Sequence, residues 1–136
     1  IMKKNLLFAL AAFLLLFTAC GKESSLADAF TEADVKAEAK TLIDEFNAGN
    51  YQAIIDKGSD LMKSSITAEQ WDAAVKPYVD KAGTFKSIEK EVIAGQQDNA
   101  KNDYAVYVAV AAYENSKIQF TITFNTEMQV EQFLIK

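Results

Sequence analysis

Residues 104–124 read YAVYVAVAAYENSKIQFTITF, and most of the fold can be inferred from this segment and its neighbours. Its second half alternates apolar and polar side chains, as in Ile118, Gln119 and Phe120, and this period of two is typical of a strand with one buried face. Its first half also alternates, with valines in one row and alanines beside Tyr107 in the other. The link between the halves, 114–116, is short and made of turn residues, so the two strands are predicted to form an antiparallel hairpin.

Further segments with a period of two flank this hairpin on both sides. Residues 85–95 form a long candidate strand whose imperfect alternation predicts a β-bulge, and residues 128–135 form the last strand. The polar loop 96–103 and the short turn 125–127 connect them to the hairpin. We therefore expect a four-stranded antiparallel meander. Because the strand at 118–124 is apolar on one side only, helices should cover one face of the sheet, and the other should be wet or face a shallow cavity.

Before residue 84 the apolar period changes to 3.6, which indicates amphipathic helices. The first predicted helix follows Thr31, a residue that can cap its start, and stops at Gly49. The second begins at Tyr51 and carries Gly58 on its apolar face, which suggests either a close approach to a neighbouring backbone or a break. The two apolar stripes consist of Val35, Ala39, Leu42, Ile43 and Phe46, and of Tyr51, Ile54, Ile55, Leu61 and Met62.

A third helix is predicted between a capping box, formed by Thr67 and Gln70, and Gly83. Pro77 predicts a kink in this helix, because proline removes a backbone donor and clashes with the preceding turn. The apolar stripe of this helix consists of Trp71, Ala74, Val75, Tyr78, Val79 and Ala82. The expected fold is therefore α+β, with three N-terminal helices packed on a curved four-stranded antiparallel sheet in a single domain, residues 32–136.

The N-terminal segment predicts export from the cytoplasm. A short basic region precedes twelve apolar residues, 6–17, a run that is too short to span a bilayer comfortably but is typical of a signal-peptide core. Residues 17–21, Phe-Thr-Ala-Cys-Gly, resemble the lipobox of bacterial lipoproteins, with Phe in the place where Leu is usual. The resemblance implies cleavage before Cys20 and a diacylglyceryl group on that residue. The alternatives are an ordinary secretory signal cleaved elsewhere and a buried apolar helix.

A lipid on Cys20 would hold the protein at the cell membrane, facing outside the cytoplasm. Each buried acyl methylene contributes about 0.8 kcal/mol, and two or more chains hold a protein stably on a bilayer. We therefore expect residues 1–19 to be a signal peptide, residues 20–31 to be the lipidated N-terminus and a tether, and residues 32–136 to be the folded domain. The membrane is the first expected partner.

The composition excludes several kinds of chemistry. Without Lys3 and Lys4 of the predicted signal peptide, the chain has 12 basic residues against 19 acidic ones, a net charge of about −7. This acidic charge and the absence of arginine argue against binding to nucleic acid. The sequence has no histidine and a single cysteine, so Ser-His-Asp and Cys-His catalysis and Cys/His zinc sites are excluded. A carboxylate-only Ca²⁺ site is conceivable, but no Asp-x-Asp-x-Asp-Gly pattern occurs, and no cofactor is expected.

Residues 34–136 resemble a small bacterial domain family of uncharacterised function. The similarity rests on Ala-Gly-Asn-Tyr at 48–51, Ser-Ile-Thr-Ala-Glu-Gln-Trp at 65–71 and Gly-Thr-Phe at 83–85. That family is similar in fold to the nuclear-transport-factor-two-like, or cystatin-like, α+β cone. The resemblance implies a helix-lined cup facing a curved antiparallel sheet, a shape found in ketosteroid isomerases, dehydratases and many non-catalytic modules, so the fold alone does not decide the function.

Aromatic side chains are the candidates for lining such a cup, since ligand pockets are mostly apolar with a few polar groups. These candidates are Trp71, Tyr78, Tyr104, Tyr107 and Tyr113. Aromatic residues at helical or strand spacing are more often core than ligand-lining. Tyr107 and Tyr113 are the favoured pair, because the alanines beside them leave room for a ligand.

Three functions of different class remain open. The leading hypothesis is a non-enzymatic, membrane-anchored module that binds a small apolar ligand or an envelope protein. The second is an enzyme like the isomerases or dehydratases, which requires a buried carboxylate with a raised pKa facing a Tyr. The carboxylates in question are Asp72, Asp103 and Glu114, which are as well explained as surface caps and turn residues. The third is a structural homodimerisation domain in which the sheets of two subunits pack together.

Overall fold

The structure, a computed structural model, describes residues 25–136. In this part of the chain four helices precede four strands. The elements are α2 (Glu32–Asn47), α3 (Tyr51–Asp56), α4 (Asp60–Ser65), α5 (Ala68–Ala82), β1 (Phe85–Gln97), β2 (Asp103–Tyr113), β3 (Lys117–Phe124) and β4 (Val130–Ile135). The expected α+β class is confirmed. The predicted signal peptide, residues 1–19, and the predicted lipid site Cys20 lie outside the described residues.

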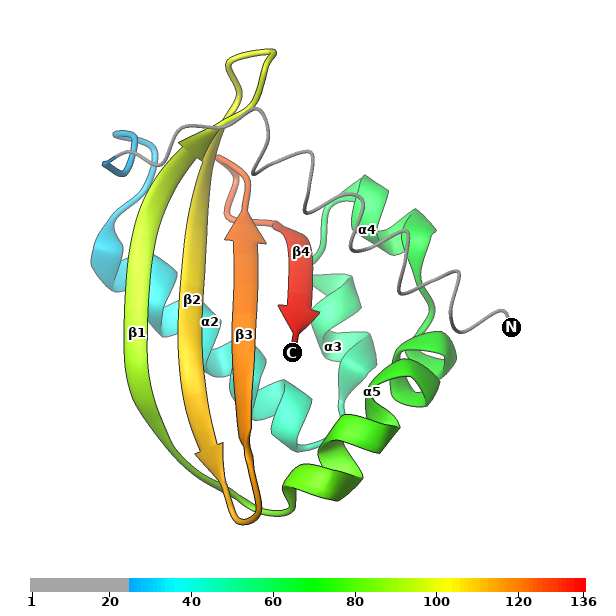
Figure 1. Cartoon of the computed structure of the whole chain (residues 1–136). Coiled ribbons are helices and arrows are strands. Elements are labelled where there is room, and N and C mark those ends of the chain that lie inside the picture. The colour runs from blue at the N-terminus through cyan, green and yellow to red at the C-terminus, as the bar shows by residue number, and fades with distance from the viewer. Residues whose placement is uncertain (1–24) are drawn as a thin grey trace.

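The four strands form one antiparallel sheet in the order β1-β2-β3-β4, so the predicted meander is confirmed. Figure 1 shows a curved sheet in which β1 and β2 are long and β4 is short. The link between β2 and β3 is the predicted turn at 114–116. The expected bulge is also present, because the register of β1 against β2 shifts between Phe85 and Ser87 and again between Ile88 and Lys90.

The sheet has one face covered by helices and one more open face. In Figure 1, α2 passes behind β1, β2 and β3, while α3, α4 and α5 lie beyond β4. The buried side chains of the two central strands follow the predicted alternation. On the helix-covered face they are Ala105, Tyr107, Ala109, Ala111 and Tyr113 in β2, and Ile118, Phe120, Ile122 and Phe124 in β3. Thr123 of β3 departs from this alternation, because it is buried on the other face. On the other face, Val92 of β1 is 59% exposed.

The expected count of three helices is wrong, because the described chain divides the predicted second helix into α3 and α4. Backbone hydrogen bonds hold the link between them against the start of β4. The N–H of Ser59 donates to the carbonyl of Val130 (2.9 Å), and the N–H of Val130 donates to the carbonyl of Lys57 (3.0 Å). Both alternatives foreseen for Gly58 therefore hold, since the helix breaks there and a neighbouring backbone approaches.

The helix ends follow the predicted signals. The Thr31 side chain caps α2 by accepting from a backbone N–H in the first turn (3.2 Å), and Gly49 follows that helix with a φ of +74°. The capping box of Thr67 and Gln70 starts α5. The helix continues through Pro77 to its end at Gly83, so proline does not terminate it.

The packed structure begins before α2. Leu26 and Ala27 lie against the core, and Phe30 is only 6% exposed. The N–H of Phe30 donates to the carbonyl of Ala27 (3.0 Å), which closes a turn. Part of the segment expected to be a tether, residues 20–31, is therefore packed onto the domain.

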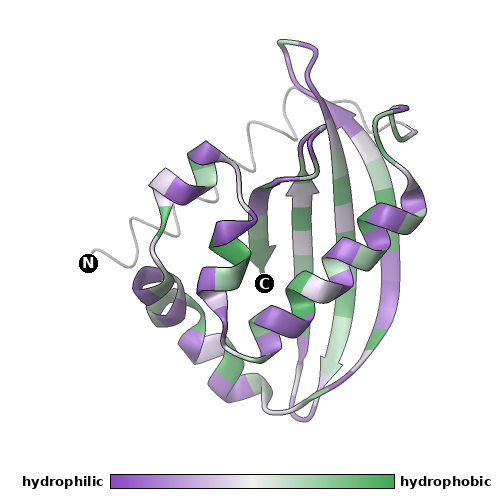
Figure 2. Ribbon diagram, turned by 180° about the vertical axis from the view of Figure 1, so that it is seen from behind, coloured by the Kyte–Doolittle hydropathy of each residue, from purple (hydrophilic) through white to green (hydrophobic). Residues whose placement is uncertain are grey.

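An aromatic cluster joins the helices to the sheet. The ring of Phe46 meets Tyr51 and Phe120 edge to face, with centroids 5.7 and 5.2 Å apart, and Trp71 meets Phe133 at 5.2 Å. All five side chains are buried. Figure 2 shows the helical side of the molecule, with α2 crossing the sheet and hydrophilic residues recurring along its outer surface. Since large aromatic side chains bury the most apolar area, this cluster is the main connection between the two layers.

We predict that Gly58→Ala destabilises the fold by about 1 to 3 kcal/mol, the usual cost of forcing extra atoms into a packed site. An added Cβ would lie 2.9 Å from Met62 Sδ and 3.0 Å from the backbone carbonyl oxygen of Ile55. The sulfur can move, but the carbonyl belongs to the last turn of α3. Urea unfolding of the protein without its signal segment measures the change.

Gly49→Asn is the matched control for this substitution. An added Cβ at Gly49 meets nothing within 4 Å, and Asn tolerates the left-handed conformation that the φ of +74° requires. The control should therefore cost less than about 1 kcal/mol. Equal costs at the two glycines would show that the contact at Gly58 is not tight.

Candidate functional site

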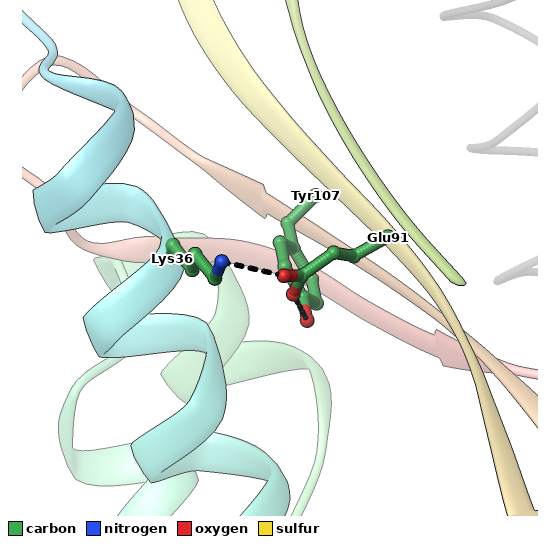
Figure 3. A network of polar contacts seen from close by, with 3 residues as sticks. All are labelled: Lys36, Glu91 and Tyr107. Atoms are coloured by element: carbon green, nitrogen blue, oxygen red, sulfur yellow. Dashed lines mark hydrogen bonds and ion pairs between the residues drawn. The ribbon is translucent and has the colours of Figure 1, made fainter. Parts of the chain in front are cut away.

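Three side chains from two layers form a polar network between α2 and the sheet. The hydroxyl of Tyr107, on β2, donates to Glu91 Oε2 at 2.8 Å. The other carboxylate oxygen, Glu91 Oε1, lies 2.7 Å from Lys36 Nζ of α2. Figure 3 shows these contacts, with Lys36 reaching from the helix and the other two side chains reaching from the strands. The network links the start of α2 to the middle of β1.

A bulge in β1 explains why Glu91 faces the helix. Ile88 pairs with Ala111 and Lys90 pairs with Val110, so Glu89 is an extra residue in the strand. Because side chains alternate along a strand, one extra residue exchanges its two faces. Glu91 then pairs with Ala109 on the buried face of β2. That small neighbour leaves the carboxylate free to meet the phenol of Tyr107.

The network fixes the protonation state of each member at neutral pH. Hydrogen bonds from Lys36 and then from Tyr107 lower the pKa of the Glu91 carboxyl, against a smaller opposing effect of burial. The hydrogen bond to Glu91 and its charge raise the pKa of Lys36. Burial, followed by the hydrogen bond to Glu91, raises the pKa of the Tyr107 phenol above its ordinary value. The group is therefore an ion pair with a neutral phenol attached.

This arrangement is poorly suited to proton transfer. A general base works best with a pKa near the operating pH, and the isomerase-like enzymes raise a carboxyl pKa to reach it. The environment of Glu91 lowers its pKa instead, and that of Tyr107 makes the phenol a weaker acid. What the network does supply is a charge-assisted tie between a helix and a strand.

The structure places the predicted aromatic residues in different surroundings. Trp71 is 4% exposed and stacks on Tyr51 with an interplanar angle of 10°. Tyr113 is also buried, and its hydroxyl donates to the side-chain oxygen of Asn47 at the end of α2. Tyr78, in contrast, is 42% exposed on α5. Trp71 and Tyr113 therefore belong to the core together with Tyr107, and Tyr78 does not join them.

Tyr104, near the start of β2, also has a carboxylate partner. The hydroxyl of Tyr104 donates to Asp98 Oδ2 at 3.0 Å, and burial followed by this bond raises the pKa of the phenol to about 12. The same carboxylate accepts from the backbone N–H groups of Ala100 and Asn102, both at 2.9 Å. These bonds close the turn, so Asp98 is explained by turn geometry.

The three carboxylates considered for catalysis do not pair with these tyrosines. Asp72 and Glu114 are exposed. Asp103 is half-buried and accepts a hydrogen bond from the side-chain amide of Gln97 (3.2 Å). Sequence analysis did not single out Glu91 or Lys36. The signal that could have found Glu91 is the imperfect alternation of β1, which places a charged residue where an apolar one is expected.

A second polar cluster ties the α3–α4 link to the β3–β4 turn. The hydroxyl of Ser59 donates to Glu131 Oε2 at 2.8 Å and accepts from the N–H of Met62 at the start of α4 (3.3 Å). The side-chain amide of Asn125 donates to Glu131 Oε1 at 3.1 Å. The Ser59 hydroxyl caps α4 and Glu131 joins this cap to the β3–β4 turn, so this cluster also has a structural explanation.

The described residues can be compared with the requirements of a metal site and of a membrane-spanning helix. Within residues 25–136, no group of three or more His, Cys, Asp and Glu side chains is placed to hold a metal ion. In the same range, no helix has the length and apolarity needed to cross a membrane.

The fold defines this protein as an α+β domain with helices on one face of a four-stranded meander. A solved NMR structure of a protein from Ruminococcus gnavus ATCC 29149 has a similar fold, with a TM-score of 0.70 and 22% sequence identity, over 82% of this chain and 96% of that one. Residues 39–133 match the family model described as "Protein of unknown function (DUF3887)", and the chain belongs to that family. No curated protein matches the chain.

We predict that Glu91 and Tyr107 stabilise the fold as a coupled pair. Glu91→Gln and Tyr107→Phe should each destabilise the protein. The destabilisation of the double variant should be about 1 kcal/mol less than the sum of the two, because either substitution alone removes the charge-assisted part of the Tyr107–Glu91 hydrogen bond. Denaturant unfolding at pH 7 measures the cycle. Glu89→Gln is the matched control, since that carboxylate pairs with Lys117 and should add independently to Tyr107→Phe.

The contribution of Glu91 should also depend on pH in a defined direction. A carboxyl whose pKa is lower in the folded state contributes stability above its unfolded pKa and loses it as the pH falls through the folded value. The difference between wild type and Glu91→Gln should therefore be constant above about pH 5 and shrink below the ordinary Glu value of 4.5. A difference that grows on acidification would contradict the assignment.

Proposed function

We propose that this chain is a lipid-anchored lipoprotein outside the cytoplasm, and that its domain is a non-catalytic accessory module of the cell envelope. The observation that supports a non-catalytic role is the ionisation state of the Glu91–Tyr107 pair. On the buried face of the sheet, the Tyr107 phenol is hydrogen-bonded to the Glu91 carboxylate, and this carboxylate forms an ion pair with Lys36. A module of this kind acts by binding other envelope components.

The lipid anchor is supported by the sequence before the domain. Twelve apolar residues, 6–17, lead into Phe-Thr-Ala-Cys-Gly, and Cys20 is the single cysteine of the chain. A cysteine placed by chance would fall at the end of such a segment only rarely. The charge of the remaining chain, about −7, fits a partner other than nucleic acid.

The shape of the domain supports the same assignment. We propose that it is a nuclear-transport-factor-two-like cone, because α2 lies on the inner face of a curved antiparallel meander. In such cones the space between helices and sheet is where a small ligand binds. Here the mutually packed rings of Phe46, Tyr51, Trp71, Phe120 and Phe133 occupy that space. An accessory role through the surface therefore fits better than an enclosed apolar ligand.

Cys20→Ser should release the protein from the membrane. In cells producing the wild type we expect the protein in the membrane pellet and in the detergent phase after cloud-point extraction, because acyl chains partition into both. It should also incorporate a clickable fatty acid. The variant should lose the label and leave the membrane fraction, while Ser24→Ala, a matched change outside the predicted lipid site, should behave as wild type. An unlabelled wild type would refute the anchor.

The accessory role predicts that the domain carries no small apolar molecule. We expect native mass spectrometry of the protein extracted from membranes to give the same mass as denaturing mass spectrometry, namely the chain with its covalent lipid. Tyr107→Phe, at a position favoured for lining a cup, is the control. Its native and denaturing masses should also agree with each other, and should differ from those of the wild type only by the substitution. A constant additional mass, lost on denaturation, would favour the small-ligand hypothesis instead.

A further inference from the structure

The start of the packed chain is fixed at one end of the domain. Leu26 and Ala27 lie against the core and Phe30 is buried, so the chain is held to the domain from residue 26 onward. Figures 1 and 2 both show this segment beside the end of β1 from which the β1–β2 turn, residues 98–102, departs. We call this end of the molecule the anchor end.

The opposite end of the domain carries the β2–β3 turn. There the N–H of Asn115 donates to the carbonyl of Ala82 (2.8 Å), so the turn packs against the end of α5. We call this the distal end. β2 runs between the two ends over 11 residues, and at about 3.3 Å per residue its length is about 35 Å.

The chain between Cys20 and the domain is shorter than that strand. Six residue steps separate Cys20 from Leu26, and a fully extended chain spans at most about 3.3 to 3.6 Å per step, or about 20 Å in total. A tether of this reach cannot let the domain turn freely above the surface. An inverted orientation, with the distal end on the bilayer and the anchor end pointing away from it, would require the tether to pass alongside a domain about 35 Å long.

We propose that the anchor end is the surface of this domain that faces the lipid bilayer, held there by the short tether, and that the distal end projects away from it. The proposal rests on the proposed function, because it requires a lipid on Cys20. It assigns the β1–β2 turn and the first turn of α2 to the membrane side. The β2–β3 turn and the end of α5 are then the parts presented to other envelope components.

The charge of the anchor end shows that the tether, and not attraction to the lipid headgroups, must set this orientation. Exposed acidic side chains lie before α2 and in its first turn, namely Asp28, Glu32 and Asp34. The β1–β2 turn adds Asp98 and one cation, Lys101. An acidic surface is repelled by anionic lipids over about one Debye length, about 8 Å at physiological salt. The domain should therefore stand close to the membrane without adhering to it.

The test compares the distance of the two ends from a bilayer. With the sulfur of Cys20 bound to lipid, a thiol introduced at Asn99→Cys or at Asn115→Cys is the single site for a maleimide donor dye. Full-length lipidated protein is placed in phosphatidylcholine vesicles that contain a headgroup-labelled acceptor lipid. We expect at least twofold more energy transfer from position 99 than from position 115. A second pair repeats the comparison with Asp28→Cys, in the turn before α2, and Lys81→Cys, at the end of α5.

Each outcome decides the proposal. Equal transfer from the two ends, or more from position 115, overturns the orientation while leaving the anchor intact. A protein whose mass lacks the lipid, and which does not float with the vesicles, refutes the proposed function itself. As a control for cause, twelve Gly/Ser residues inserted after Ser24 should reduce the difference in energy transfer between the two ends, because the extended reach of 18 residue steps, about 60 Å, exceeds the length of the domain. A contrast that survives this insertion unchanged would show that a surface contact sets the orientation, and would overturn the role of the tether.

Discussion

The bulge at Glu89 in β1 is the constraint on which the buried face of the sheet depends. A shift of one residue exchanges the two faces of a strand, so the segment after the bulge presents Glu91 and Ile93 to the helices and Val92 to solvent. Without it, Lys90 and Val92 would turn toward α2. The phenol of Tyr107 would then be buried without its carboxylate, at the cost of an unsatisfied buried hydroxyl.

Small side chains on β2 complete what the bulge begins. Ala105, Ala109 and Ala111 stand on the same face as Tyr107, and all three are buried. Because an alanine extends little from the sheet, α2 can lie close to β2 while the longer side chains of β3 and the helices fill the rest with aromatic rings. The alanines that suggested space for a ligand therefore have a structural explanation, which is the close packing of a helix.

The features that could be predicted from the sequence are the local ones. Strand alternation, the turn at 114–116 and the caps at Thr31 and Thr67 depend on neighbouring residues, and the structure contains them all. The division of the second helix depends on hydrogen bonds with Val130, which no local pattern reveals. The partners of Tyr107 were missed for the same reason, since Glu91 reaches it only through the shifted register and Lys36 only through the packing of α2.

The polar network and the proposed anchor meet at the same helix. In a chain held at Cys20, any pull from the membrane enters the domain through Phe30 and the first turns of α2. Helix ends fray more readily than their centres, so contacts at this end decide whether the pull is transmitted to the whole domain. Phe30 is buried just before the helix, and Lys36 binds Glu91 of β1 within its second turn. A charge-assisted tie at that place serves a tethered domain better than it would serve proton transfer.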